Sequence, residues 1–285
     1  MSKYKSFDSE PVAPLGRLPR GACDSHFHVF GPRERYPVLP GIEHDMPEAN
    51  FEALLELHRA LGIERGVICA TTVNGSNHQV VLDALAALGP NYRACALNSV
   101  FEEQPDSYVR KLHDAGVRGA RFNLLKMLNR TPSPERIRRD LNRIRDMGWY
   151  CKVQPDYQEP LQSIAPFEAL DSPVIIDHLG RASSADGPVA RKMLELLERG
   201  NFWLLLSNAY KLSKAGPPWE DTLPVLRKFI DAAPDRLLWA TDWPHTFHEV
   251  APPNDGELLN FFYRATDDTE RRKILADNPD ELFFS

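Results

Sequence analysis

Residues 65–97 read RGVICATTVNGSNHQVVLDALAALGPNYRACAL, and this stretch decides the fold. Two short apolar runs, at 65–72 and 92–99, have the length and composition of buried strands. Between them, apolar residues recur at helical spacing and stop at Gly89, a residue type that commonly follows the last turn of a helix. The stretch therefore predicts a strand–helix–strand unit whose two strands run parallel.

The same rhythm runs through the rest of the chain. Further helical patterns end in the same way, at Gly62, Gly116, Gly148 and Gly200. No glycine-rich phosphate-binding turn follows the first strand, which argues against an open, doubly wound sheet. A (β/α)8 barrel needs roughly 250 residues, so the 285 residues favour an α/β fold of the TIM-barrel type. The predicted strands are Ala22–Phe30, Arg65–Thr72, Tyr92–Ser99, Arg118–Leu124, Tyr150–Gln154, Val174–His178, Phe202–Ser207 and Leu237–Asp242.

The predicted domain organisation is simple. Residues 1–20 contain three prolines and are expected to form an N-terminal arm that wraps the barrel. Residues 21–285 are predicted to form a single barrel domain. Within it, the segment from Asp255 onward supplies the last helix and a closing helix around 270–276.

Composition excludes several classes of function. The 34 Lys and Arg residues against 40 Asp and Glu leave a formal net charge of −6. Nucleic acids and anionic membranes require a basic surface that releases counterions, so we expect neither as a partner. No apolar run has the length of a signal peptide or a membrane span, so we expect a cytoplasmic protein. Four scattered cysteines without a CxxC pair favour buried free thiols.

Polar residues stand at the ends of three predicted strands. The first strand carries His26 and His28, which share one face because side chains alternate along a strand. A later strand ends at His178, and the eighth ends at Asp242. Any of these histidines alone could be an ordinary core residue. Catalytic groups of barrels lie at the carboxyl ends of the strands, and strand eight adjoins strand one, so we expect the four side chains to converge.

These motifs resemble the amidohydrolase superfamily, and the resemblance spans residues 21–285. It is closest in the branch that holds 2-pyrone-4,6-dicarboxylate hydrolase and related lactonases. The segments that carry it are Cys23–Pro32, Arg118–Asn123, Asp177–Gly180 and Thr241–His245.

The resemblance implies roles for the four converging residues. Asp242 would activate water, while His26, His28 and His178 would polarise the lactone carbonyl. The chemistry of the residue types agrees, because lactone hydrolysis needs a base for water and donors for a tetrahedral oxyanion. Imidazoles and a carboxylate also bind zinc at catalytic sites, so a metal could replace the donors.

The expected number of bound metal ions depends on the residue types that strands four and five offer as ligands. By resemblance, two-metal members add a Lys or carboxylate on the fourth strand and a His on the fifth. Here these strands offer Arg121–Asn123 and Cys151–Gln154, with no His in either, so we expect no two-metal site and no required cofactor. A single zinc ion held by His26, His28 and Asp242 is the alternative.

Basic residues near the predicted rim indicate an acidic substrate. Arg121 suits bidentate binding of a carboxylate. By resemblance, the pyrone hydrolase carries two further arginines where this chain has Met127 and Lys211. We therefore expect a related anionic lactone whose acid group is held by Arg121 and Lys211. Further candidates for substrate binding, each also readable as an ordinary polar side chain, are Lys126, Arg130, Asn208 and His245.

Together these features predict a hydrolase that opens a carboxylated lactone, pyrone- or muconolactone-like, by water attack on the ring ester, in the catabolism of aromatic compounds. The alternatives on the same scaffold are a metal-dependent decarboxylase or other amidohydrolase-type hydrolase, and a sugar-lactone hydrolase or isomerase. A non-catalytic interaction protein is disfavoured by the intact set of polar strand ends. The expected partner is the small anionic lactone, and the sequence leaves a homo-oligomer open.

Overall fold

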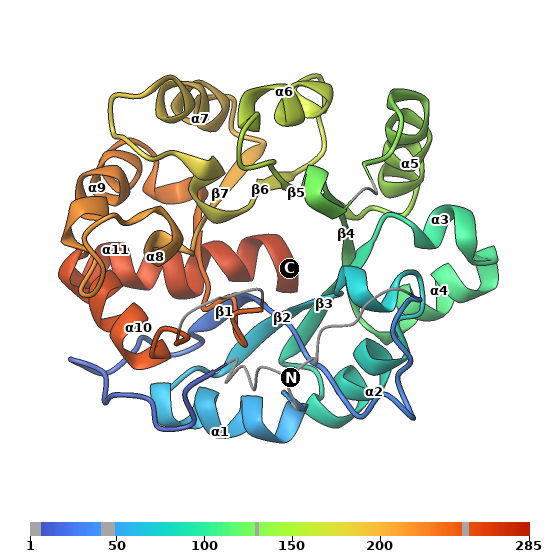
Figure 1. Ribbon diagram of the computed structural model, residues 1–285, viewed down its shortest axis with the longest axis horizontal. Coiled ribbons are helices and arrows are strands. Elements are labelled where there is room, and N and C mark those ends of the chain that lie inside the picture. Colours follow the sequence, from blue (N-terminus) through green and yellow to red (C-terminus); the bar gives the residue numbers. More distant parts are fainter. Residues whose placement is uncertain (1–6, 41–48, 129–130, 247–250) are drawn as a thin grey trace.

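The structure, a computed structural model, describes residues 7–40, 49–128, 131–246 and 251–285. Eight parallel strands follow one another in chain order and form a ring, with helices around its outside (Figure 1). This confirms the predicted α/β fold, a (β/α)8 barrel. The strands are β1 (Cys23–Phe27), β2 (Arg65–Cys69), β3 (Tyr92–Leu97), β4 (Val117–Asn123), β5 (Tyr150–Gln154), β6 (Val174–Ile176), β7 (Phe202–Leu206) and β8 (Leu237–Trp239).

The strands form where long apolar runs can be buried on both faces. Every residue of β7, with the sequence FWLLL, is buried, as expected for a parallel sheet covered by helices. Several strands end earlier than predicted. The prediction for the eighth strand extended to Asp242, but β8 ends at Trp239. Asp242 has a φ of 63°, in the left-handed region, which no strand residue adopts.

The helices follow the predicted pattern of capping and amphipathicity. The side chain of Asn50 accepts a hydrogen bond from the backbone N–H of Ala53 and starts α1. Gly62, with a φ of 79°, ends α1 in the left-handed conformation that glycine adopts at low cost. The α-helices are α1 (Phe51–Leu61), α2 (Gln79–Leu88), α3 (Val100–Glu103), α4 (Asp106–Ala115), α5 (Pro134–Asp146), α6 (Pro160–Ile164), α7 (Pro188–Glu198), α8 (Ala209–Leu212), α9 (Leu223–Ala232), α10 (Asp255–Arg264) and α11 (Asp268–Arg272).

The barrel closes between β1 and the segment after β8. The backbone N–H of Asp242 donates to the carbonyl of His26 at 3.0 Å. The N–H of His28 donates to the carbonyl of Trp243 at 2.8 Å. These two bonds join the first and last strands just beyond their carboxyl ends, so they place Asp242 beside both histidines.

The two chain ends pack against the barrel in different ways. The segment 7–20 runs along α10, where Asn254 and Asn260 hydrogen bond to its backbone at Val12 and Leu15. At Gly256, a Cβ atom would lie 1.9 Å from the carbonyl oxygen of Val12, so this approach requires glycine. At the other end of the chain, Phe283 packs on Tyr150 at the amino-terminal end of the barrel interior. Figure 1 shows the C-terminus near the barrel axis.

The cysteines agree with the expectation from the sequence. All four are buried and carry free thiols. Among the described residues, no helix has the length and apolar character needed to cross a membrane.

Candidate active site

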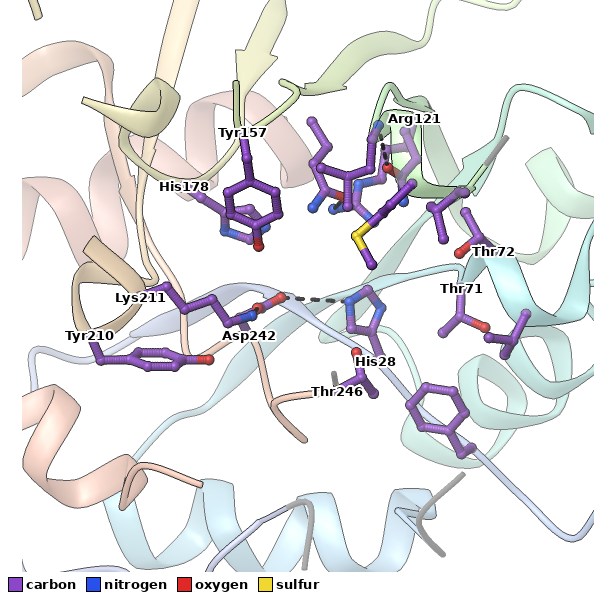
Figure 2. A pocket seen from close by; sticks show the side chains of 17 residues that line it. His28, Thr71, Thr72, Arg121, Tyr157, His178, Tyr210, Lys211, Asp242 and Thr246 are labelled. Carbon is purple, nitrogen blue, oxygen red and sulfur yellow. Dashed lines mark hydrogen bonds and ion pairs between the residues drawn. The ribbon is translucent and has the colours of Figure 1, made fainter. Parts of the chain in front are cut away.

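A cavity of about 520 Å³ opens at the carboxyl ends of the strands. Figure 2 shows His28, His178, Lys211 and Asp242 around this cavity, with Asp242 pointing toward His28. Arg121 lies on the side of the cavity away from Asp242 (Figure 2). Cationic, acidic and imidazole groups therefore share one cavity at the position where barrels carry their active sites.

Asp242 is the one carboxylate among the described residues that line the cavity. Its Oδ1 lies 3.4 Å from Nε2 of His26 and 3.6 Å from Nε2 of His28. Its Oδ2 accepts a hydrogen bond of 2.8 Å from Asn208 and lies 3.5 Å from Nζ of Lys211. Burial opposes ionisation, but the neighbouring imidazoles and Lys211 outweigh it and hold the pKa of Asp242 well below its usual value. Asp242 is therefore an ionised base.

A buried aspartate on β1 fixes the backbone that carries Asp242. Asp24 accepts hydrogen bonds from the N–H of Thr241 at 3.2 Å and from its hydroxyl at 2.5 Å. The same hydroxyl accepts a bond from the N–H of Trp243 at 3.0 Å. Because both neighbours of Asp242 are held, its left-handed backbone conformation is stabilised and its carboxylate is aimed at the cavity.

The hydrogen bonds of His28 and His178 determine which nitrogens face the cavity. Nδ1 of His28 lies 2.7 Å from the carbonyl oxygen of Cys69, which can only accept, so Nδ1 carries the proton and Nε2 faces Asp242. Nδ1 of His178 lies 2.8 Å from the hydroxyl of Ser207. Burial lowers the pKa of His178 well below its usual value, so this imidazole is neutral. The Ser207 hydroxyl can donate to Nδ1, and in that arrangement Nε2 of His178 carries the proton.

His26 rests on a buried charge network that the sequence did not reveal. Its Nδ1 lies 3.4 Å from Oδ1 of Asp177, and this carboxylate is completely buried. Nζ of Lys152 lies 3.2 Å from the same oxygen. Oδ2 of Asp177 accepts a hydrogen bond of 2.9 Å from Nε of Arg121. Although burial and the ammonium of Lys152 oppose it, the neighbouring Cys69 and Asp177 raise the pKa of His26.

Two signals in the sequence pointed to this network without identifying it. Asp177 immediately precedes His178 in the motif that supplied the histidine. Lys152 interrupts an otherwise apolar strand, where a charged side chain calls for a buried partner. Neither signal names the partner, because the partners lie on other strands.

The predicted substrate-binding residues divide into two groups. Arg121, Met127 and Lys211 line the cavity, as predicted for one anion site. Arg121 uses Nε for Asp177 and Nη2 for Gln154, so Nη1 is the nitrogen outside these two bonds.

The remaining candidates lie elsewhere. Lys126 is exposed and its Nζ lies 2.6 Å from Glu159, so it is not among the described cavity residues. Asn208 contacts Asp242 and lies behind the cavity surface. His245 is buried between Tyr210 and Asp255, outside the described lining. Arg130 lies outside the described residues.

Comparison with known proteins now decides the family. The family model described as amidohydrolase matches residues 23–284, nearly the whole barrel. The chain belongs to the amidohydrolase family.

Among amidohydrolase relatives, a 2-pyrone-4,6-dicarboxylate hydrolase of Comamonas testosteroni is 32% identical and covers 97% of this chain and 94% of its own. A 4-sulfomuconolactone hydrolase of Rhizobium radiobacter is 34% identical, with 95% of this chain and 93% of the relative covered. A ligand-free crystal structure from Agrobacterium tumefaciens has a TM-score of 0.82 and 27% identity, and covers 95% of this chain and 98% of that chain.

The donor set of this amidohydrolase fits one divalent ion. Nε2 of His26, Nε2 of His28 and Oδ1 of Asp242 are 3.3 to 3.6 Å apart. Ligands about 2.0–2.1 Å from a tetrahedral zinc stand roughly 3.4 Å apart. His178 also lies within 4.8 Å of His26 and Asp242. On the far side of His26, the ammonium of Lys152 disfavours a second cation.

Proposed function

We propose that this amidohydrolase opens a carboxylated lactone by water attack on the ring ester. One observation carries the proposal: an ionised carboxylate, Asp242, lies beside the imidazoles of His26 and His28 at the wall of a cavity that also presents Arg121 and Lys211. This arrangement combines a base, donors for an oxyanion and cations for an acid group. Two relatives that cover nearly the whole chain, at 32% and 34% identity, are lactone hydrolases by name, which supports the same reaction.

In the proposed mechanism, Asp242 accepts a proton from water as the water oxygen attacks the lactone carbonyl carbon. The bond between this carbon and the ring oxygen then breaks. The proton held by Asp242 passes to the departing ring oxygen, so the product is an open-chain hydroxy acid, or its keto form where that oxygen was enolic. Asn208 and Lys211 hold the second carboxylate oxygen and keep Oδ1 directed toward the water.

The histidines stabilise the negative charge that develops on the carbonyl oxygen. His26 is completely buried and outside the described lining, so it acts from behind, with its Nε2 3.3 Å from Nε2 of His28 and 3.4 Å from Oδ1 of Asp242. His178 offers a neutral Nε2–H, because the Ser207 hydroxyl occupies its Nδ1. His28 keeps Nε2 beside Asp242 and completes the polar wall. Fixed donors in a buried site need no reorganisation as the charge appears.

The acid group of the substrate lies, in this proposal, against Arg121 and Lys211. Because Arg121 already holds Asp177 and Gln154, an acid group that binds it must share the guanidinium with them. Met127 lines the same cavity and brings no charge. The cavity therefore favours a lactone with fewer or differently placed acid groups than a pyrone dicarboxylate.

We further propose that the reaction requires no metal. Asp242 already contacts Asn208 and Lys211. A positive charge on His26 would stabilise the oxyanion without a metal ion. If an ion binds, His26, His28 and Asp242 would hold it, and it would polarise the carbonyl and lower the pKa of bound water.

The test is a panel of pyrone, muconolactone and aldonolactone substrates, followed by ring absorbance and proton release. Hydrolysis of at least one carboxylated lactone is expected, while release of CO₂ or activity confined to aldonolactones would contradict the proposal. The free thiols support a cytoplasmic enzyme. The net charge of −6 argues against nucleic acid or an anionic membrane as a partner, and the proposed partner is the small anionic lactone.

A further inference from the structure

Two cations share one buried carboxylate beneath the cavity. Lys152 is 1% exposed, and its Nζ lies 3.2 Å from Oδ1 of Asp177. Arg121 is 3% exposed, and its Nε lies 2.9 Å from Oδ2 of the same residue. Either cation alone would neutralise Asp177, so the presence of both calls for an explanation.

The register of the barrel brings the three side chains together. Arg121 on β4 is directly opposite Lys152 on β5, and Lys152 is opposite Ile175 on β6. Asp177 follows two residues after Ile175, so its side chain leaves the sheet on the same face, one layer nearer the cavity. A carboxylate in that layer can contact both cations and His26 at once.

The two cations differ in their access to substrate. Arg121 lines the cavity, whereas Lys152 is not among its described lining residues. An acid group in the cavity therefore meets the guanidinium of Arg121 and competes with Asp177 for it. The ammonium of Lys152 stays with Asp177 whether the cavity is filled or empty.

We propose that Lys152 is a positioning residue that keeps Asp177 aimed at His26 while Arg121 binds the acid group of the lactone. This inference rests on the proposed function and deepens it. Lys152 approaches Oδ1, which is also the oxygen that faces Nδ1 of His26. Its ammonium therefore holds in place the atom that orients the imidazole.

Stability alone does not account for this lysine. A buried ion pair is commonly no more stabilising than apolar side chains of similar volume, and a methionine would fill the same space. Lys152 lies below Arg121, the residue proposed to bind the acid group. A second cation is needed there if Asp177 must keep an ion pair while the substrate is bound. The expected consequence is that the need for Lys152 depends on the charge of the substrate.

The experiment compares Lys152→Met with the unaltered enzyme on two substrates, muconolactone and its uncharged methyl ester. With the ester, Arg121 remains on Asp177, and kcat of the variant should stay within about threefold of the unaltered enzyme. With the anionic lactone, Asp177 has lost Lys152 and shares Arg121 with the acid group, and kcat should fall by about 10- to 100-fold. Val153→Ala, a buried change on the opposite face of β5, is the matched control and should lower both activities equally or not at all.

Equal losses on both lactones, or unchanged kcat on the anionic one, would overturn the proposal. If Lys152→Met does not fold, the double variant Lys152→Met with Asp177→Asn removes both the ammonium and the carboxylate, and it should fold. Its kcat should be lower on both lactones. Near-normal activity of the double variant would refute the role of the network.

If the unaltered enzyme opens no lactone, the proposed function fails and the inference is tested by binding. Protein labelled with ¹⁵N-histidine would then be titrated with succinate. In the unaltered protein the His26 resonances should be insensitive to succinate, and in Lys152→Met they should shift. Equal behaviour of the two proteins would reject the inference.

Discussion

Oδ1 of Asp242 lies 3.4 Å from Nε2 of His26, although the two residues come from opposite ends of the barrel sequence. The contact exists because the segment after β8 hydrogen bonds to the end of β1. It places the Asp242 carboxylate, the proposed base, beside the imidazole of His26. Substitutions on either side of this contact therefore test the mechanism directly.

The first prediction concerns the base. Asp242→Asn preserves the size and the hydrogen-bonding shape of the side chain but cannot accept the proton of water, so kcat should fall by ~10²–10⁴-fold. Steady-state kinetics with a thermal melt would measure this. Asp255→Asn, which removes a buried carboxylate that contacts His245 outside the described lining, is the control and should retain kcat. A folded Asp242→Asn enzyme with near-normal kcat would exclude Asp242 as the base.

The second prediction concerns metal. In the proposed mechanism, imidazole groups stabilise the oxyanion without a metal. Exhaustive chelation should therefore change kcat by less than about twofold. Metal analysis and assays before and after dialysis against a chelator would check it. One zinc per chain, with activity lost on removal and restored on addition, would instead make His26 and His28 ligands.

The third prediction concerns substrate choice. Met127 and Lys211 line the same cavity as Arg121, so the site has one guanidinium and one ammonium for acid groups. A lost charge-assisted contact costs about 2–5 kcal/mol, or ~30- to 5,000-fold in kcat/KM. Poor turnover of pyrone dicarboxylate is expected, with partial recovery in the double variant Met127→Arg with Lys211→Arg.

Competition assays with two lactones would measure this selectivity. Lys126→Arg is the matched control, because Lys126 pairs with Glu159 outside the described lining and should leave the preference unchanged. Efficient hydrolysis of pyrone dicarboxylate by the unaltered enzyme would contradict the selectivity argument and leave the lactonase assignment standing.

The fourth prediction concerns stability and pH. His78 is buried, and its Nε2 accepts a hydrogen bond of 2.8 Å from the backbone N–H of Leu97, so it must be neutral. Burial lowers the pKa of His78 to about 4. The unfolded chain binds this proton near pH 6.5, so stability is complete above that pH and is lost as the pH falls toward 4.

The expected loss attributable to His78 is about 2 kcal/mol of unfolding free energy between pH 7.5 and pH 5. Urea unfolding at both pH values would measure it. His78→Gln keeps an acceptor without a titrating group and should show a smaller pH dependence. An identical dependence in the variant would assign the acid sensitivity to other groups.

Local sequence was sufficient to predict the barrel and its catalytic rim. Each strand is a short, largely buried run, and the helices α1, α2, α4, α5 and α7 end at or next to a glycine, so both signals are local in the sequence. The convergence of His26, His28, His178 and Asp242 also followed, because it depends on strand ends and on closure of the barrel. The structure places these side chains together.

Tertiary structure alone decided which polar groups pair with one another. The register of β4, β5 and β6 sets Arg121 and Lys152 on Asp177, and the loop geometry turns Lys126 outward to Glu159. Such contacts join residues far apart in the chain, so they depend on strand register and side-chain direction. The sequence by itself therefore determined the fold and which polar side chains converge at the carboxyl ends of the strands, whereas the three-dimensional packing decided which charges contact them.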